Sequence, residues 1–197
     1  DNIIRFDIGG NEQWVMEGRA LYSVNSGGSV FIGDKTGLNT TLDTCNSIFI
    51  GHEAGKSNID GFSNAFIGYR AGHHNSTGSW NTFSGMHAGY FNTIGSLNSF
   101  VGSHVGVKNI NGNRNAFLGF KAGYNNVSGS KNSYYGVASG FGNTSGSFNT
   151  AIGHNAGFTG STFNNTTAIG YNAQNTASNQ VRIGNTAVTS IGGYAAW

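Results

Sequence analysis

The sequence predicts an all-β protein, a parallel β-solenoid of about nine 17-residue coils. An apolar segment closed by glycine recurs along the chain at intervals of 18, then 17 seven times in succession, then 14. These marker glycines are Gly33, Gly51, Gly68, Gly85, Gly102, Gly119, Gly136, Gly153, Gly170 and Gly184. A second glycine follows four positions later in each coil from Gly37 to Gly157. Because this period is too short for separate folded units, each repeat is one coil stacked on the last.

The composition supports a repetitive fold and excludes a disordered chain. The 197 residues include 33 glycines and no proline, and only 9% are charged. Glycine costs backbone entropy unless its position needs it, and here the glycines recur in register. The 13% aromatic content argues against disorder. Cys45 is the single cysteine, so we expect no disulfide framework and a buried small side chain at that position.

Charge divides the chain into two parts. All eight acidic residues lie at or before Asp60, whereas the rest of the chain carries six bases and no acidic side chain. Stacked coils avoid columns of like charge, which is the simplest interpretation. The alternative is a mildly positive surface that attracts anionic glycans, lipopolysaccharide or nucleic acid. We expect no nucleic-acid partner and, because no stretch is apolar enough to cross a bilayer, no membrane insertion.

Three segments follow from the pattern. Residues 1–27 alternate apolar and polar positions around Gly9, Gly10 and Gly18, which predicts two or three antiparallel strands that form an N-terminal cap. Residues 28–184 form the solenoid repeats. Residues 185–197 lead out of the array as a C-terminal exit or neck segment.

Within a coil, the short apolar run that ends in glycine predicts a strand, as in residues 64–68. The Asn-x-x-Gly segments, such as 75–78 and 92–95, predict turns because Asn and Gly tolerate left-handed backbone. Stacked coils place Asn over Asn, so we expect ladders of side-chain amides. Small residues three positions after each marker glycine indicate a thin interior.

Both residues before most marker glycines are apolar, and adjacent strand side chains point to opposite faces. One face fills the coil, and the other needs a dry partner, because an exposed aromatic column is an aggregation hazard. We therefore predict a homotrimer with cyclic symmetry, with its chains either intertwined or side by side. The alternative is that a turn of the same chain covers the column. The predicted core and trimer-packing residues are Phe66, Phe83, Phe100, Phe117, Tyr134, Ile67, Val101, Leu118 and Ile152.

The repeat resembles two related groups of proteins. The pattern Asn-x-apolar-Ile-Gly-x-x-Ala-Gly is similar to the head repeat of trimeric autotransporter adhesins, although the 17-residue period is longer than the adhesin coil. The fuller pattern, with Asn-x-x-Gly-Ser-x-Asn, resembles repeats of bacterial and phage tail-fibre-like proteins. In those proteins a segment like residues 179–192 precedes a C-terminal intramolecular chaperone that trimerises the fibre and cuts itself off. The resemblance implies such a chaperone in the full-length protein and an extracellular, cell-surface or virion location. The chaperone is absent from this chain, so no self-cleavage is expected of it.

We predict no enzyme, cofactor or metal. Glycosidases and lyases on β-solenoids usually need carboxylates, and none follows Asp60. His87 and His104 occupy equivalent positions in adjacent coils and are expected to stack, but two imidazoles without a carboxylate are more often structural. Ice binding is a further alternative, disfavoured because the position before the core residue of each strand varies among Ala, Ser and Thr instead of forming a regular Thr face.

The variable positions of the frame are the candidates for binding. Trp80, Arg114 and Lys131 share a corner column that precedes each Asn and is expected to face outward, and Tyr90 and Tyr124 lie in a second column. Aromatic rings beside bases suit a saccharide. The alternative for the second column is packing between chains. We therefore predict a trimeric adhesin or tail-fibre segment that attaches to cell-surface glycans or other receptors, with a purely structural spacer as the alternative.

Overall fold

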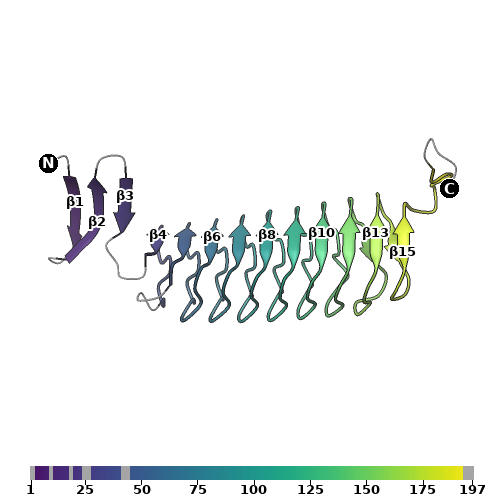
Figure 1. Ribbon diagram of the computed structural model, residues 1–197, viewed down its shortest axis with the longest axis horizontal. Coiled ribbons are helices and arrows are strands. Elements are labelled where there is room, and N and C mark those ends of the chain that lie inside the picture. Colours follow the sequence, from purple (N-terminus) through teal and green to yellow (C-terminus); the bar gives the residue numbers. More distant parts are fainter. Residues whose placement is uncertain (1–2, 9–10, 18–19, 24–27, 41–44, 193–197) are drawn as a thin grey trace.

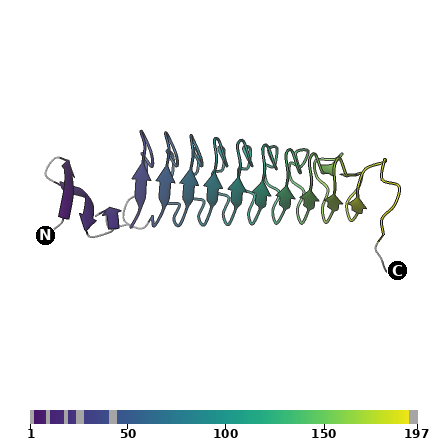
Figure 2. The ribbon, with the colours of Figure 1, turned by 90° about the horizontal axis from the view of Figure 1, so that it is seen from above.

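The structure is a computed structural model that describes residues 3–8, 11–17, 20–23, 28–40 and 45–192. The predicted parallel β-solenoid is confirmed: the coils stack into a long row with their strands side by side (Figures 1 and 2). Ten strands form one parallel sheet in the order β15-β13-β11-β10-β9-β8-β7-β6-β5-β4. No helix long and apolar enough to cross a membrane occurs in the described ranges.

The strands of this sheet are short and in register. Phe66 of one strand pairs with Phe83 of the next, one coil further along. The ten strands are β4 (Val30–Ile32), β5 (Ile48–Ile50), β6 (Ala65–Ile67), β7 (Thr82–Ser84), β8 (Ser99–Val101), β9 (Ala116–Leu118), β10 (Ser133–Tyr135), β11 (Thr150–Ile152), β13 (Thr167–Ile169) and β15 (Val181–Ile183). A second small parallel pair joins β12 (Gly157–Phe158) to β14 (Gln174–Asn175) in the last coils.

The N-terminal strands form a separate antiparallel sheet. It consists of β1 (Ile3–Ile8), β2 (Asn11–Glu17) and β3 (Ala20–Ser23), in the order β1-β2-β3. The predicted antiparallel strands are therefore present. That this sheet caps the solenoid stays a prediction. Parts of the predicted cap, including residues 24–27, and residues 193–197 of the predicted exit segment lie outside the described residues.

Left-handed backbone turns the chain at fixed points of each coil. In the coil that begins with β6, Gly68 has φ 135°, Arg70 has φ 54° and Gly72 has φ 58°. Trp80 has φ 57° just before the next strand. Backbone hydrogen bonds then join successive coils inside and outside the sheet: Ala65 N donates to Asn81 O at 2.8 Å, and His74 N donates to Tyr90 O at 3.0 Å. The coil-to-coil bonds are therefore not confined to the strands.

The core is a single column of stacked aromatic rings. The rings of Phe31, Phe49, Phe66, Phe83, Phe100, Phe117 and Tyr134 follow one another with centroids 4.6–5.0 Å apart and planes within 5–16°. The second glycine of each of these coils lies directly over a ring. A Cβ added at Gly89 would lie 2.5 Å from Cε2 of Phe83. A glycine is therefore needed at this position for the ring to fit inside so thin a coil.

The ring column ends after Tyr134. In the following coils a small residue takes the ring position, and a ring from another part of the coil fills the interior. Ala151 and Ala168 occupy the ring position of the last coils, and both are fully buried. Phe158, from β12, is buried in the same core, and its ring centroid lies 5.9 Å from that of Tyr134. The large side chain has moved from one wall of the coil to another, so the interior stays filled.

Two ladders of buried asparagines complete the interior, as the sequence predicts. In the first ladder, Asn92 Nδ2 donates to Asn75 Oδ1 at 2.7 Å and to Gly95 O at 2.9 Å. In the second, Asn81 Oδ1 accepts a hydrogen bond from Asn98 N at 3.0 Å. Each amide therefore bonds to the equivalent residue of the adjacent coil, and it satisfies buried backbone groups at the same time.

Replacing one ladder residue tests this arrangement. Asn92→Ala removes a donor to Asn75 Oδ1 and leaves Asn109 Nδ2 without its acceptor Asn92 Oδ1. We expect a loss of about 2–4 kcal/mol in the free energy of unfolding, because buried amide groups lose their partners. The measurement is denaturant unfolding followed by circular dichroism. Asn111→Ala, at an exposed position, is the matched control and should change stability by less than about 0.5 kcal/mol. Equal effects of the two changes would contradict the ladder.

Candidate functional site

The structure places Trp80, Arg114 and Lys131 in one exposed corner column. All three have left-handed backbone, with φ of 57°, 56° and 59°. The Trp80 side chain is half exposed, and its ring meets that of Phe62 edge to face at 4.6 Å. The Lys131 amine lies 4.7 Å from the centroid of the Phe148 ring. This column offers rings and cations to solvent, but one coil with an aliphatic Leu97 separates Trp80 from Arg114.

Tyr90 and Tyr124 lie in a different column, on the turn that follows the second glycine of the coil. The Tyr90 ring is 5.0 Å from that of His73 and 5.1 Å from that of His87. The Tyr124 ring lies close to the amines of two lysines, at 5.6 Å and 6.0 Å. None of the contacts among the described residues joins these tyrosines to the corner column, so the five predicted ligand residues do not form one site.

The predicted packing residues divide between the two faces of the sheet. The aromatic residues Phe66, Phe83, Phe100, Phe117 and Tyr134 point inward and are at most 1% exposed. The aliphatic residues point outward. On the single chain, Ile67, Val101, Leu118 and Ile152 are 40–49% exposed. The outer face of the sheet is therefore an apolar surface that no described residue of the same chain covers.

Three histidines, His73, His74 and His87, contact the Tyr90 ring, and a fourth, His104, contacts His87. His87 Nδ1 lies 3.3 Å from His104 Nε2, so one ring donates a hydrogen bond to the other. These two rings are neighbours, as expected, but their planes are 80° apart, so they meet edge to face instead of stacking in parallel. His73 and His74 contact the same tyrosine, with their own centroids 4.4 Å apart. No group of three or more possible metal ligands occurs among the residues that the structure describes.

Glu53 is a buried carboxylate held by three basic groups. Lys56 Nζ and Arg70 Nε each lie 2.7 Å from its oxygens, and His73 Nε2 lies 3.4 Å away. The hydrogen bond from Lys56, aided by Arg70, lowers the Glu53 pKa from 4.5 to about 2. Burial, with the nearby His74, lowers the His73 pKa to about 4. Sequence reasoning missed this cluster, although the 17-residue separation of Glu53 and Arg70 places them on adjacent coils.

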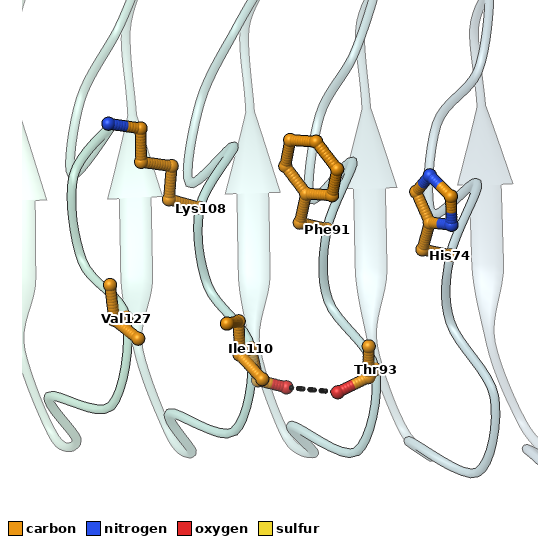
Figure 3. A pocket seen from close by; sticks show the side chains of 6 residues that line it. All are labelled: His74, Phe91, Thr93, Lys108, Ile110 and Val127. Carbon is orange, nitrogen blue, oxygen red and sulfur yellow. Dashed lines mark hydrogen bonds between the residues drawn. The ribbon is translucent and has the colours of Figure 1, made fainter.

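An open groove of about 390 Å³ lies on the side of the coils away from the sheet (Figure 3). Two rows of side chains line it. His74, Phe91 and Lys108 form one row, and Thr93, Ile110 and Val127 form the other. Thr93 Oγ1 donates a hydrogen bond to Ile110 O at 3.0 Å. None of these six residues was predicted from the sequence. Their signal was the 17-residue period, which aligns each row across successive coils.

The Glu53 cluster predicts a specific pH dependence of stability. A carboxyl group whose pKa is lowered by folding stabilises the protein above its unfolded pKa, and that stabilisation is lost as the pH falls. For Glu53 the loss runs from about pH 4.5 down to about pH 2. Glu53→Gln should therefore be less stable than the unmodified chain at pH 6, and the difference should shrink toward pH 2. Thermal unfolding from pH 7 to pH 2 measures this, and a difference that is independent of pH would contradict it.

The chain was compared with known proteins. No protein-family model matches it, and neither a curated protein nor a solved structure was found to match.

Proposed function

We propose that this chain is a segment of an extracellular homotrimeric fibre, an adhesin or a tail fibre, that attaches to cell-surface glycans or other receptors by multivalent contacts. The outer face of the ten-stranded sheet carries this proposal. Eight apolar side chains of its outer row are 37–49% exposed, and Ser84 of β7 interrupts the row: the eight are Ile32, Ile67, Val101, Leu118, Tyr135, Ile152, Ile169 and Ile183. A monomeric protein rarely exposes so long an apolar strip.

The second row of the same face suits close packing. The residue before most core side chains is small or β-branched, for example Ala65, Ser99, Ala116 and Thr150. A sheet with small residues beside an apolar row lets another sheet approach closely. Closed cyclic packing of identical chains about an axis along the rod would bury every apolar row. The resemblance of the repeat to trimeric fibres favours three chains.

A trimer would also explain how individually weak contacts give a high overall affinity. Three copies of one site on a stiff rod increase the effective concentration for the second and third contact. The proposal assigns binding instead of catalysis, because the sequence after Asp60 contains no carboxylate side chain for acid–base chemistry. The corner column with Trp80, Arg114 and Lys131 and the groove of Figure 3 are then the surfaces available to a receptor.

A charge placed on the apolar row tests the assembly. We expect the unmodified chain to have a mass in solution near three times its own 20.6 kDa, measured by light scattering coupled to size exclusion. Leu118→Asp puts a carboxylate into the proposed interface and should give monomers, because burying an unpaired charge costs several kcal/mol. Its circular dichroism should stay that of a β-solenoid.

The matched control is Leu97→Asp. Leu97 is 45% exposed, close to the 49% of Leu118, but it lies on the corner column. Its left-handed backbone, with φ 62°, also accepts Asp. This variant should remain a trimer. A mass near 20.6 kDa for the unmodified chain would overturn the proposal, and a mass near twice that value would replace the threefold arrangement by a face-to-face dimer.

A further inference from the structure

The groove of Figure 3 stays open in the proposed fibre. The figure shows the strands of the sheet behind the groove, on the far side of the coils. Packing of the sheets against one another would therefore leave the groove on the outside, once in every chain. All six residues that line the groove belong to one chain, so a single chain is sufficient for binding. The inference rests on the proposed fibre only for the number of grooves in each assembly.

The first row of the groove is a flat aromatic platform. The rings of His74 and Phe91 are 10° from parallel, with centroids 5.2 Å apart on adjacent coils. Figure 3 shows them side by side, with their faces turned out of the groove toward the viewer. The Phe91 side chain is 44% exposed. An open aromatic face is a surface on which the C–H side of a sugar ring can pack.

The second row supplies an apolar floor with a hydrogen-bonding group at one end. Ile110 is 44% exposed, and Val127 continues the row on the next coil. Thr93 donates its hydroxyl hydrogen to Ile110 O, so the hydroxyl oxygen can still accept a hydrogen bond. The volume of about 390 Å³ lies within the usual range for small-ligand sites, about 300–1,000 Å³.

Lys108 gives the groove its charge. It ends the aromatic row, and its amine lies 5.6 Å from the Tyr124 ring centroid. The sequence contains no acidic residue after Asp60, so no side chain of the surrounding coils neutralises this amine. By contrast, Lys56, near the His74 end of the row, is paired with Glu53. A single cation beside two rings fits one carboxylate, whereas a nucleic acid needs several phosphate contacts.

We infer that the His74–Phe91–Lys108 groove binds an acidic saccharide, with a pyranose ring packed on the Phe91 and His74 faces and its carboxylate on Lys108 Nζ. The carboxylate can belong to a uronic acid or to a sialic acid, because the groove recognises the chemistry that they share. Calorimetric titration of the 197-residue chain with tetragalacturonate and with sialyllactose distinguishes these sources. Neutral galactotetraose and lactose are the uncharged controls. We expect at least one acidic probe to bind more tightly than its neutral counterpart.

Two substitutions test separately what the Phe91 ring and the Lys108 charge contribute to binding. Phe91→Ala should weaken binding of the acidic probe about tenfold, because the stacking face is lost. Phe120→Ala is its control, since Phe120 is 45% exposed on another column, and it should leave the affinity within about twofold. Lys108→Gln should remove the preference for the acidic probe and its dependence on salt, while Lys35→Gln in the first coil should not.

The outcomes distinguish this inference from the proposed fibre. A trimer that binds neither acidic probe overturns the inference and leaves the fibre as a spacer. A monomer that binds, with the expected effect of Phe91→Ala, supports the groove and overturns the fibre. Loss of binding in a Trp80→Ala, Arg114→Ala double variant, with unchanged binding by Phe91→Ala, would overturn the inference in favour of the corner column.

Discussion

The structure depends on one constraint: equivalent residues of adjacent coils must stay in contact along the rod. Parallel strands hydrogen-bond at a spacing of about 4.8 Å, and every interior side chain must therefore be compatible with its own copy at that distance. Phenyl rings satisfy this condition by stacking, with centroids 4.8 Å apart for Phe49 and Phe66. Asparagine amides satisfy it by donating to one neighbour and accepting from the other, as Asn92 does. This need for contact between equivalent residues explains why the sequence repeats every 17 residues.

The same constraint leaves the outside of the coil free to vary. Column positions that point outward carry Trp80, Leu97 and Arg114 in succession without disturbing the coils, because their left-handed backbone is the same in each case. A charge can also be compensated between coils, as Glu53 is by Arg70 of the next coil. A rod with a fixed interior and variable outer columns can acquire binding surfaces without a change of fold, and this separation underlies the proposed fibre.

The period predicted the strands, the core rings and the asparagine ladders from the sequence alone, because each depends only on spacing. Features that depend on how deeply a side chain is buried, or on which way it points, could not be predicted from the sequence. Ala151 stands where earlier coils have a core ring, and Phe158, on another side of the coil, is the large buried side chain instead. The repeat pattern does not show that Phe158 points inward. His87 and His104 meet at 80° because a hydrogen bond turns the rings, which spacing cannot indicate. The period aligns each row of the groove, but only the structure shows that the two rows line one surface, since Phe91 and Ile110 occupy different positions of successive repeats.

The most direct test of the register is the deletion of one whole coil. Removing residues 116–132, a complete repeat, joins Asn115 to Ser133 in the same register as Asn115 to Ala116. Removing only residues 116–123 takes out half a repeat, including β9, and leaves residues 124–132 as half a coil with no strand of the sheet and no core ring. Thermal unfolding followed by circular dichroism should give a cooperative transition close to that of the unmodified chain for the whole-repeat deletion, and a clearly lower midpoint for the half-repeat deletion. If the two deletions destabilise the chain equally, stacking in register is not what holds the rod together.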